Sequence, residues 1–126
     1  MEEVDLLELI GGEKTVERLV EIFYSKIEKD PLLRPLFPDD LEEGKKWQKL
    51  FLIQRFGGKR DYEKQRGHPR LRKRHMPFKI GFKERDRWVQ LMKESLDEVG
   101  ITEKHPARFQ LDRYFEIVAT KMVNQK

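Results

Sequence analysis

The sequence predicts an all-α fold, and three observations lead to this expectation. Apolar residues recur every three or four positions in several segments, which is typical of helices with one buried face. No segment alternates between apolar and polar residues for long enough to indicate a strand. Glycine or proline separates the periodic segments, four of which are long enough for substantial helices. Such helices bury their apolar faces by packing one pair against another.

The first third of the chain is expected to contain a short helix, a long helix and a turn. The short helix lies around residues 6–10 and ends at Gly11-Gly12, where glycine allows a sharp change of direction. The long helix ends at Asp30-Pro31, and its buried stripe consists of Val16, Leu19, Val20, Phe23, Tyr24 and Ile27. Pro31 and Pro38 then enclose one or two turns, from which Phe37 is expected to point inward.

The next helix is predicted from Asp40 to about Phe56, where Gly57-Gly58 ends it. Asp40 and Glu43 have the spacing of a capping box, in which two side chains bind free backbone N–H groups of the first turn. One face of this helix carries Gly44, Gln48, Phe51 and Leu52, with Trp47 beside it. A glutamine on an inward face needs a hydrogen-bond partner, because an unpaired amide is costly to bury.

Residues 59–67 are predicted to form an irregular loop, which is long for a compact domain. A short helix follows, because Pro69 suits a first helical position and Pro77 prevents continuation past His75. From Lys59 to His75 there are eight Lys or Arg residues against only two acidic ones. Such a run is most often a solvated surface, but it also fits an anionic ligand.

Two long helices complete the predicted fold. The first covers residues 84–99 and stops at Gly100, and its inward face carries Trp88, Met92, Leu96 and Val99. The second is capped by Thr102, and its stripe consists of Ala107, Leu111, Phe115, Val118, Ala119 and Met122. Three faces predicted to be buried thus carry a hydrogen-bonding group, on Tyr24, Gln48 and Trp88.

Length and composition exclude several classes of protein. The 126 residues suit one domain spanning 1–126. The absence of cysteine rules out disulfides, iron–sulfur clusters and thiolate zinc sites. No apolar run is long enough to span a bilayer, and the acidic start from Met1 to Asp5 is unlike a signal peptide, so a cytoplasmic location is expected.

Of the three histidines, only His75 lies where a metal ligand is expected. It closes a short predicted helix and follows three basic residues, and a neutral imidazole is a common ligand of iron or zinc. His68 and His105 look structural. A zinc site made by His68 and His75 lacks a third ligand nearby in the sequence, so zinc is not expected.

Motifs for hydrolysis and for phosphate binding do not fit. Ser25 and Ser95 lie within predicted helices, without the glycine-flanked turn that exposes a nucleophile. Gly57-Gly58-Lys59 lacks the other residues of a P-loop. A single histidine beside cations, opposite aromatic and polar side chains, instead matches what a haem needs: aromatic walls, cations for the propionates, and one imidazole for the iron.

The chain resembles the group II truncated haemoglobins over nearly its whole length. The resemblance rests on a histidine-containing run and on shorter motifs: Gly11-Gly12, Phe23-Tyr24, Asp30-Pro31, residues 36–41, Phe51-Leu52, Gly57-Gly58, Tyr62, residues 67–75, Pro77-Phe78, Trp88 and residues 122–124. It implies a truncated globin fold, a two-over-two helical sandwich. In this fold a loop replaces most of the helix that carries the proximal histidine, which would account for the long basic segment.

The resemblance also implies roles for single residues. His75 resembles the proximal iron ligand, whose second ring nitrogen donates to a backbone carbonyl or similar acceptor, and Phe37 resembles an aromatic residue packed against the porphyrin. Gly44 falls at the gate of the distal helix, where a missing side chain leaves an open path to the iron. The distal donors expected to converge on the ligand are Tyr24, Gln48 and Trp88.

Further positions are expected to contact the haem. Arg74 and Tyr62 resemble residues that reach the propionates. Trp47 stands where some relatives have an arginine for a propionate, so Lys45 or Lys46 would replace that contact. The remaining porphyrin contacts are expected from Trp47, Phe51, Phe78 and Met92.

The implied function is reversible binding of oxygen, and of other small ligands such as CO or NO, at the ferrous iron of haem b. Each buried donor contributes about 0.5–1.5 kcal/mol, so two or three donors slow dissociation roughly ten- to a thousand-fold. Slow release argues against simple oxygen transport. It favours sensing, scavenging, or redox chemistry such as nitric oxide dioxygenation or peroxide turnover, and whether the protein is an enzyme stays open.

The expected partners are diatomic ligands and an unidentified reductase, with the protein a monomer or homodimer and with neither membrane nor nucleic acid bound. The alternative is a haem-free helical module that binds nucleic acid through Lys59 to Arg74. That segment has only Tyr62 for stacking against bases, and such binding weakens steeply with salt. A helical scaffold without a cofactor is a third interpretation, but it leaves the three inward polar groups unexplained.

Overall fold

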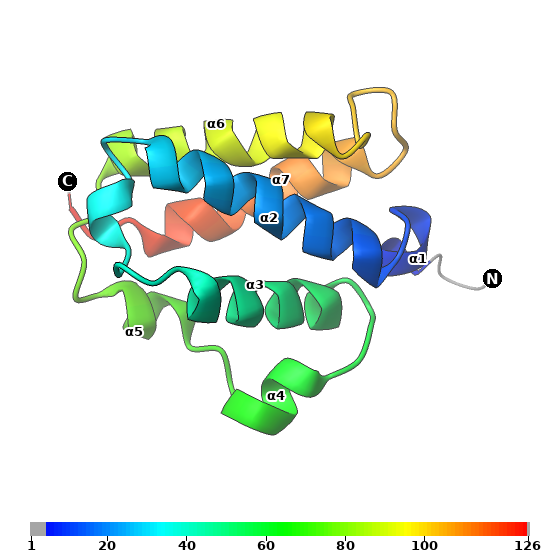
Figure 1. Cartoon of the computed structure of the whole chain (residues 1–126), viewed down its shortest axis with the longest axis horizontal. Helices are drawn as coiled ribbons and strands as arrows, with labels where there is room; N and C mark the ends of the chain where they lie inside the picture. Colours follow the sequence, from blue (N-terminus) through cyan, green and yellow to red (C-terminus); the bar gives the residue numbers. More distant parts are fainter. Residues whose placement is uncertain (1–4, 126) are drawn as a thin grey trace.

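A computed structural model of the chain describes residues 5–125, and within this range it contains helices and no strand (Figure 1). The acidic start from Met1 to Val4, which contributed to the expected cytoplasmic location, lies outside the described residues. The helices are α1 (Leu6–Leu9), α2 (Glu13–Lys29), α3 (Glu42–Arg55), α4 (Asp61–Arg66), α5 (Leu71–His75), α6 (Phe82–Glu98) and α7 (Arg108–Met122), with a 3₁₀ turn η1 (Arg34–Leu36).

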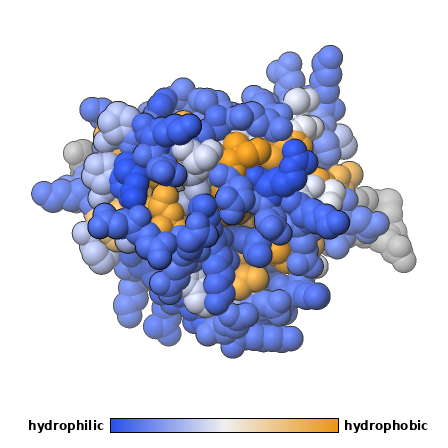
Figure 2. All heavy atoms as spheres, in the orientation of Figure 1, coloured by the Kyte–Doolittle hydropathy of each residue, from blue (hydrophilic) through white to orange (hydrophobic). Residues whose placement is uncertain are grey.

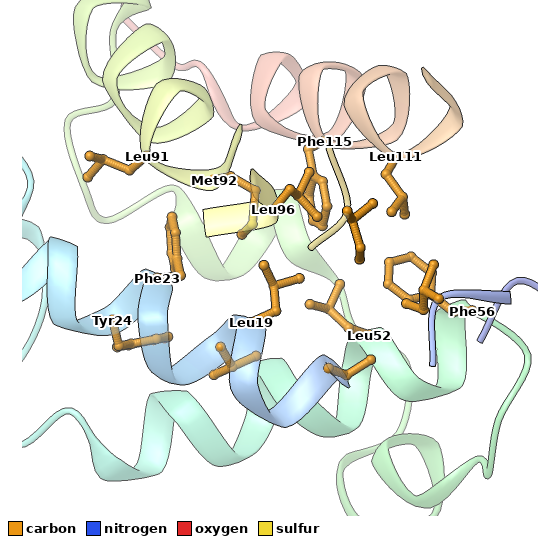
Figure 3. Packing of buried hydrophobic residues seen from close by; sticks show 14 of the residues in the cluster. Leu19, Phe23, Tyr24, Leu52, Phe56, Leu91, Met92, Leu96, Leu111 and Phe115 are labelled. Atoms are coloured by element: carbon orange, nitrogen blue, oxygen red, sulfur yellow. The ribbon is translucent and has the colours of Figure 1, made fainter. Parts of the chain in front are cut away.

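The four long helices form two pairs, as the sequence predicts. α2 packs against α3, α6 packs against α7, and α2 also contacts α6, so that one pair lies on the other (Figure 1). The predicted stripe of α2 is entirely buried, with exposed fractions of 5% or less from Val16 to Ile27. Figure 3 shows the resulting core, to which the four helices contribute Leu19, Phe23, Leu52, Phe56, Met92, Leu96, Leu111 and Phe115. The expectation of an all-helical two-over-two fold is confirmed.

The prediction of an irregular loop over residues 59–67 was wrong, because α4 forms there. The side chain of Tyr62 packs this helix against α3. The Tyr62 side chain is 2% exposed and meets the rings of Trp47 and Phe51 edge-on, at centroid distances of 5.8 and 5.5 Å. The side-chain oxygen of Gln54 accepts a hydrogen bond from the backbone N–H of Glu63 in the first turn, at 2.9 Å. A helix of six residues has too short a periodic pattern to be recognised from sequence.

Three predicted helix starts also differ in detail. Asp40 accepts a hydrogen bond from the N–H of Glu42 at 2.9 Å, and α3 begins without the expected capping box. Thr102 does not cap the last helix, because α7 begins only at Arg108, after a turn over residues 102–107. α6 begins at Phe82, two residues earlier than predicted, because the N–H of Gly81 donates to Oε1 of Glu84 at 2.7 Å.

The face shown in Figure 2 is mostly hydrophilic, with small separate groups of apolar atoms. None of the helices within residues 5–125 is both long and apolar enough to pass through a membrane.

Candidate functional site

His75 ends α5 and has a defined ring orientation. Its Nδ1 lies 2.6 Å from the carbonyl oxygen of Leu71, one helical turn earlier, which is the kind of backbone partner that the resemblance implies. A neutral imidazole that donates from Nδ1 keeps the lone pair of Nε2 free for a metal. The His75 side chain is partly exposed, and Nε2 is therefore the ring nitrogen available to a group bound beside α5.

Tyr24 lies on α2, and its hydroxyl requires a glycine on the neighbouring helix α3. A Cβ atom added to Gly44 would lie 2.8 Å from the Tyr24 hydroxyl oxygen, which is closer than real side-chain carbons come. The missing side chain at Gly44 therefore makes room for the Tyr24 hydroxyl. Tyr24 is 5% exposed, and burial raises the pKa of its hydroxyl to about 12, so the group is a neutral O–H donor at physiological pH.

Gln48 follows Gly44 by one helical turn on α3. Its Oε1 is fully buried, and within residues 5–125 it has no hydrogen-bond partner. Such an atom is costly to bury unless a ligand or solvent satisfies it. Rotation of the amide about its last bond exchanges the oxygen with the NH₂ group, so the same buried end can also present a donor.

Aromatic rings form a continuous wall beside these polar groups. Phe23 meets Tyr24 and Trp88 edge-on, at centroid distances of 5.9 and 5.2 Å, and Tyr24 meets Phe37 in the same way at 5.9 Å. Trp88 also packs against Phe115 at 5.9 Å. The structure thus connects five aromatic rings from α2, α6, α7 and the segment after η1, and three of them, Tyr24, Phe37 and Trp88, belong to the expected site.

The expected rim residues have partners within the protein. Trp47 is half-buried, and the guanidinium of Arg66 and the ammonium of Lys46 lie over its ring at 4.7 and 4.8 Å. Nζ of Lys45 pairs with Glu21 at 3.3 Å and with Glu42 at 3.2 Å. Nε of Arg74 donates to the carbonyl oxygen of Pro69 at 2.9 Å, and the Arg74 side chain is exposed.

Comparisons with known proteins agree with this arrangement. The model of the bacterial-like globin family matches residues 5–123. The chain is 43% identical to group 2 truncated hemoglobin YjbI of Bacillus subtilis over 114 residues, which cover 90% of this chain and 85% of that protein. The chain belongs to the group II truncated haemoglobins.

Solved structures of haemoglobins match the fold over almost the whole chain. The hemoglobin of Chloroflexus aurantiacus superposes with a TM-score of 0.92 at 53% identity, covering 98% of this chain and 100% of that one. The group II truncated hemoglobin of Bacillus anthracis gives a TM-score of 0.93 at 39% identity, covering 99% and 95%. Membership of this family implies a haem cofactor and the binding of small ligands at haem.

The residues of this truncated haemoglobin fit such a cofactor. His75 offers a free ring nitrogen, the buried oxygen of Gln48 lacks a partner among residues 5–125, and Gly44 and Tyr24 fit closely together where α2 meets α3. The polar groups are few and lie among aromatic side chains, which is the usual make-up of a cofactor site.

The structure places the other residues that were expected to contact the porphyrin in different surroundings. Met92 is 1% exposed and belongs to the central core (Figure 3), whereas Phe78 is 41% exposed in the segment after α5. Phe51 borders a cavity of about 800 Å³ between α3, the α4–α5 segment and α7. The cavity also reaches Val118 and Met122, which are half-buried rather than fully buried as predicted for the stripe of α7.

The other histidines have backbone partners, in agreement with their structural interpretation. Nδ1 of His68 accepts a hydrogen bond from the N–H of Arg70, and Nδ1 of His105 accepts one from the N–H of Ala107, both at 3.0 Å. Each ring stabilises a local turn. The spacing X-His-Pro, which occurs at both histidines, is the sequence signal for these turns.

Fewer cations of the basic segment between Lys59 and His75 are available to bind an anionic ligand than its charge suggests. Arg60 pairs with Glu63, Arg66 stacks on Trp47, and Arg72 and Arg74 donate to backbone carbonyls. Half of the eight cations between Lys59 and His75 therefore have partners inside the chain. Together with the family assignment, this favours a globin over a haem-free module that binds nucleic acid.

Two residues near His75 were missed as parts of the site. Arg72 donates to carbonyl oxygens at the end of α7, and Asn124 donates to the carbonyl oxygens of His75 and Phe78. The sequence marks Arg72 only as one of several cations in the motif around His75, and Asn124 only as part of a shorter motif. No local pattern indicates that the end of the chain returns to α5.

Proposed function

We propose that this globin binds haem b with His75 as the iron ligand and reversibly takes oxygen, or another diatomic ligand, on the side of Tyr24, Gln48 and Trp88. The observation that carries the proposal is the buried amide oxygen of Gln48, which has no partner in the part of the chain that the structure describes. A polar group left without a partner in a well-packed interior indicates a missing bound group. The hydrogen bond from His75 Nδ1 to Leu71 supports the other half of the site.

The haem supplies an iron centre that takes the ligand and can exchange electrons. The protein residues supply donors. With its pKa raised to about 12, Tyr24 keeps its proton at physiological pH and donates from the hydroxyl. The indole N–H of Trp88 and the NH₂ of Gln48 are further hydrogen-bond donors. Neither group ionises at physiological pH, so both can always donate. Donors held in place before the ligand arrives stabilise partial negative charge at little reorganisation cost.

Retention of the ligand by these donors favours sensing, scavenging, or redox chemistry with nitric oxide or peroxide over simple transport. One structural relative, a truncated haemoglobin of Bacillus subtilis, is described as oxygen-avid, and it is 40% identical with a TM-score of 0.88. That description supports slow oxygen release here. An unidentified reductase would keep the iron ferrous, and we propose that the protein works in the cytoplasm.

Visible absorption spectra of the purified protein test the proposal. With hemin supplied, we expect one haem per chain, a spectral change on reduction, and a further change under carbon monoxide. His75→Gly should remove the proximal ligand, and added imidazole should restore the spectrum. His105→Ala is the matched control, because His105 binds only its local turn. A colourless wild-type protein, or a His75→Gly protein with a wild-type spectrum, would contradict the proposal.

A further inference from the structure

The helix that carries His75 is too short to be stable without contacts from the rest of the protein. α5 contains five residues, whereas isolated helices below about 12–15 residues are marginal in water. The residue before its first turn is Arg70, whose φ of 47° is left-handed and unfavourable for a residue with a side chain. Its first turn has no side-chain cap. The position of His75 must therefore be set by contacts from outside α5.

Those contacts come from the end of the chain. Asn124 follows α7, and its side-chain amide both donates hydrogen bonds to the segment that begins at His75 and accepts one from it. Its Nδ2 donates to the carbonyl oxygens of His75 and Phe78, at 3.3 and 2.8 Å, and its Oδ1 accepts from the N–H of Ile80 at 2.9 Å. The N–H groups of Asn124 and Gln125 donate to the carbonyl of Ile80 as well, at 2.8 and 3.1 Å.

Arg72 makes the reverse connection from α5 to the end of α7. Its Nη1 donates to the carbonyl oxygens of Lys121 and Val123, at 2.6 and 3.1 Å. The last carbonyls of a helix have no partner inside the helix, and a cation there also interacts favourably with the helix dipole. Figure 1 shows the C-terminus beside the link between α5 and α6. We call these contacts of Arg72 and Asn124 the C-terminal clamp.

We infer that Asn124 and Arg72 are positioning residues, which set the orientation of the His75 ring by holding both α5 and the segment after it against the end of α7. The ring is bound to the carbonyl of Leu71, so its direction follows the backbone of α5. Asn124 binds the carbonyl of His75 itself. The inference rests on the proposed function, in which Nε2 of His75 binds iron.

The chemistry of the amide explains why asparagine suits this position. The side chain must donate to two carbonyls and accept from one N–H at the same time. Aspartate has nearly the same shape but accepts only, so Asn124→Asp removes the two donated bonds and keeps the accepted one. Asn124→Ala removes all three. Gln125→Ala is the matched control, because it keeps the backbone bond from Gln125 to Ile80. It removes only the 3.4 Å contact of Gln125 Nε2 with Oδ1 of Asn124, which does not involve α5.

Hydrogen exchange of the α5 amides in the cofactor-free protein measures the clamp without haem. Each hydrogen bond lost corresponds to about a two- to ten-fold change in an opening equilibrium. We expect α5 to exchange at least roughly ten-fold faster in Asn124→Ala, less so in Asn124→Asp, and at the wild-type rate in Gln125→Ala. If the Asn124→Ala protein does not fold, Asn124→Asp and Arg72→Lys decide the question.

A second measurement separates positioning from general stability. The iron–histidine stretching band of the reduced protein, read by resonance Raman spectroscopy, should shift or broaden in the Asn124 variants. Hemin transfer to apomyoglobin should accelerate in the same order as the exchange rates. Arg108→Met, which destabilises the distant α6–α7 corner, should leave the band unchanged. Bands and α5 exchange rates equal to wild type in both Asn124 variants would overturn the inference.

The two failures can be told apart. If the wild-type protein takes up no haem, the proposed function fails, and the exchange of α5 amides still shows whether Asn124 holds that helix. If haem binds through His75 while the Asn124 variants behave like Gln125→Ala in every measurement, only the inference fails.

Discussion

The close fit between Tyr24 and Gly44 makes the side chain allowed at one position depend on the other. The hydroxyl oxygen of Tyr24 occupies the space that a Cβ at Gly44 would need, whereas the nearest ring carbons would stand 3.5 Å from that Cβ, an ordinary contact distance. Residue 44 therefore has no side chain for a reason that sequence alone does not reveal. Because residue 44 is glycine, the Tyr24 hydroxyl can lie directly against the backbone of α3.

We predict that Gly44→Ala lowers the free energy of unfolding by about 1–3 kcal/mol, the usual range for an overpacked interior. In a Tyr24→Phe background the same substitution should cost much less, because the atom that clashes is gone. Urea unfolding of the four proteins of this cycle measures the coupling. Additive effects of the two substitutions would show that the hydroxyl does not limit the size of residue 44.

A second prediction concerns the donors beside the proposed ligand site. Replacement of both Tyr24 and Trp88 by phenylalanine keeps the aromatic wall but removes an O–H and an N–H. Each donor contributes about 0.5–1.5 kcal/mol, so oxygen should dissociate roughly five- to a hundred-fold faster. Stopped-flow displacement of oxygen by carbon monoxide gives the rate. An unchanged rate in the double variant would contradict the donor model.

At the scale of elements, α6 and α7 are joined by a buried arginine. Arg108 is 8% exposed, and it donates to Asp97 at 2.5 Å, to Asp112 at 2.7 Å, and to the carbonyl of Ile101 at 2.9 Å. Burial alone would lower the pKa of the guanidinium, but hydrogen bonds to the two carboxylates outweigh it and raise the pKa. The side chain therefore stays charged and connects the end of α6 to the first turn of α7.

We predict that Arg108→Met lowers the free energy of unfolding by about 2–4 kcal/mol, because it leaves a buried carbonyl without a donor and separates two carboxylates from their cation. Thermal and urea unfolding measure the loss. Arg113→Met, an exposed arginine of the same helix, is the control and should change stability little. The corner is remote from His75, so uptake of hemin at low temperature should be unaffected.

The short helices show what the sequence does not predict. The long helices α2, α3, α6 and α7 follow from periodic apolar residues, and the structure changes only their ends. α4 depends on Tyr62 packing against Trp47, and α5 depends on Arg72 and Asn124. These contacts join residues far apart in the chain, so no local window contains them.

At the scale of the whole molecule, buried tyrosines set the behaviour in alkali. Burial raises the pKa of Tyr24 to about 12, and that of Tyr114 to about 12 despite the opposing charge of Arg55. The unfolded chain releases these protons near pH 10, whereas the folded protein keeps them until about pH 12. The unfolded state is therefore favoured as the pH rises between these values, and the stability is fully present only below pH 10.

We predict a fall in the free energy of unfolding between pH 10 and 12, of roughly 2–3 kcal/mol from Tyr24 and less from the partly exposed Tyr114. Urea unfolding at stepped pH measures it. Tyr24→Phe should flatten this part of the profile, because phenylalanine has no proton to lose. An equal slope in wild type and Tyr24→Phe would show that Tyr24 ionises alike in both states.

The sequence predicts the overall layout and part of the candidate site. Residues of the long helices, such as Tyr24, Gln48 and Trp88, are placed by periodicity, and His75 is singled out by its surroundings in the chain. The structure adds how they are held: the space at Gly44, the carbonyl of Leu71, and the return of the chain to α5. These depend on three-dimensional proximity, which a resemblance can suggest but periodicity cannot.

The C-terminal clamp bears on how the protein is handled in the laboratory. An affinity tag attached close to Gln125 would lie beside the backbone bonds that Asn124 and Gln125 make to Ile80, whereas α1, near the other end of the described chain, lies away from α5 (Figure 1). Trimming by a carboxypeptidase during storage would disturb the same bonds to Ile80. A preparation whose molecules end at different residues near Asn124 would then give a mixture of haem spectra, although every molecule contains His75.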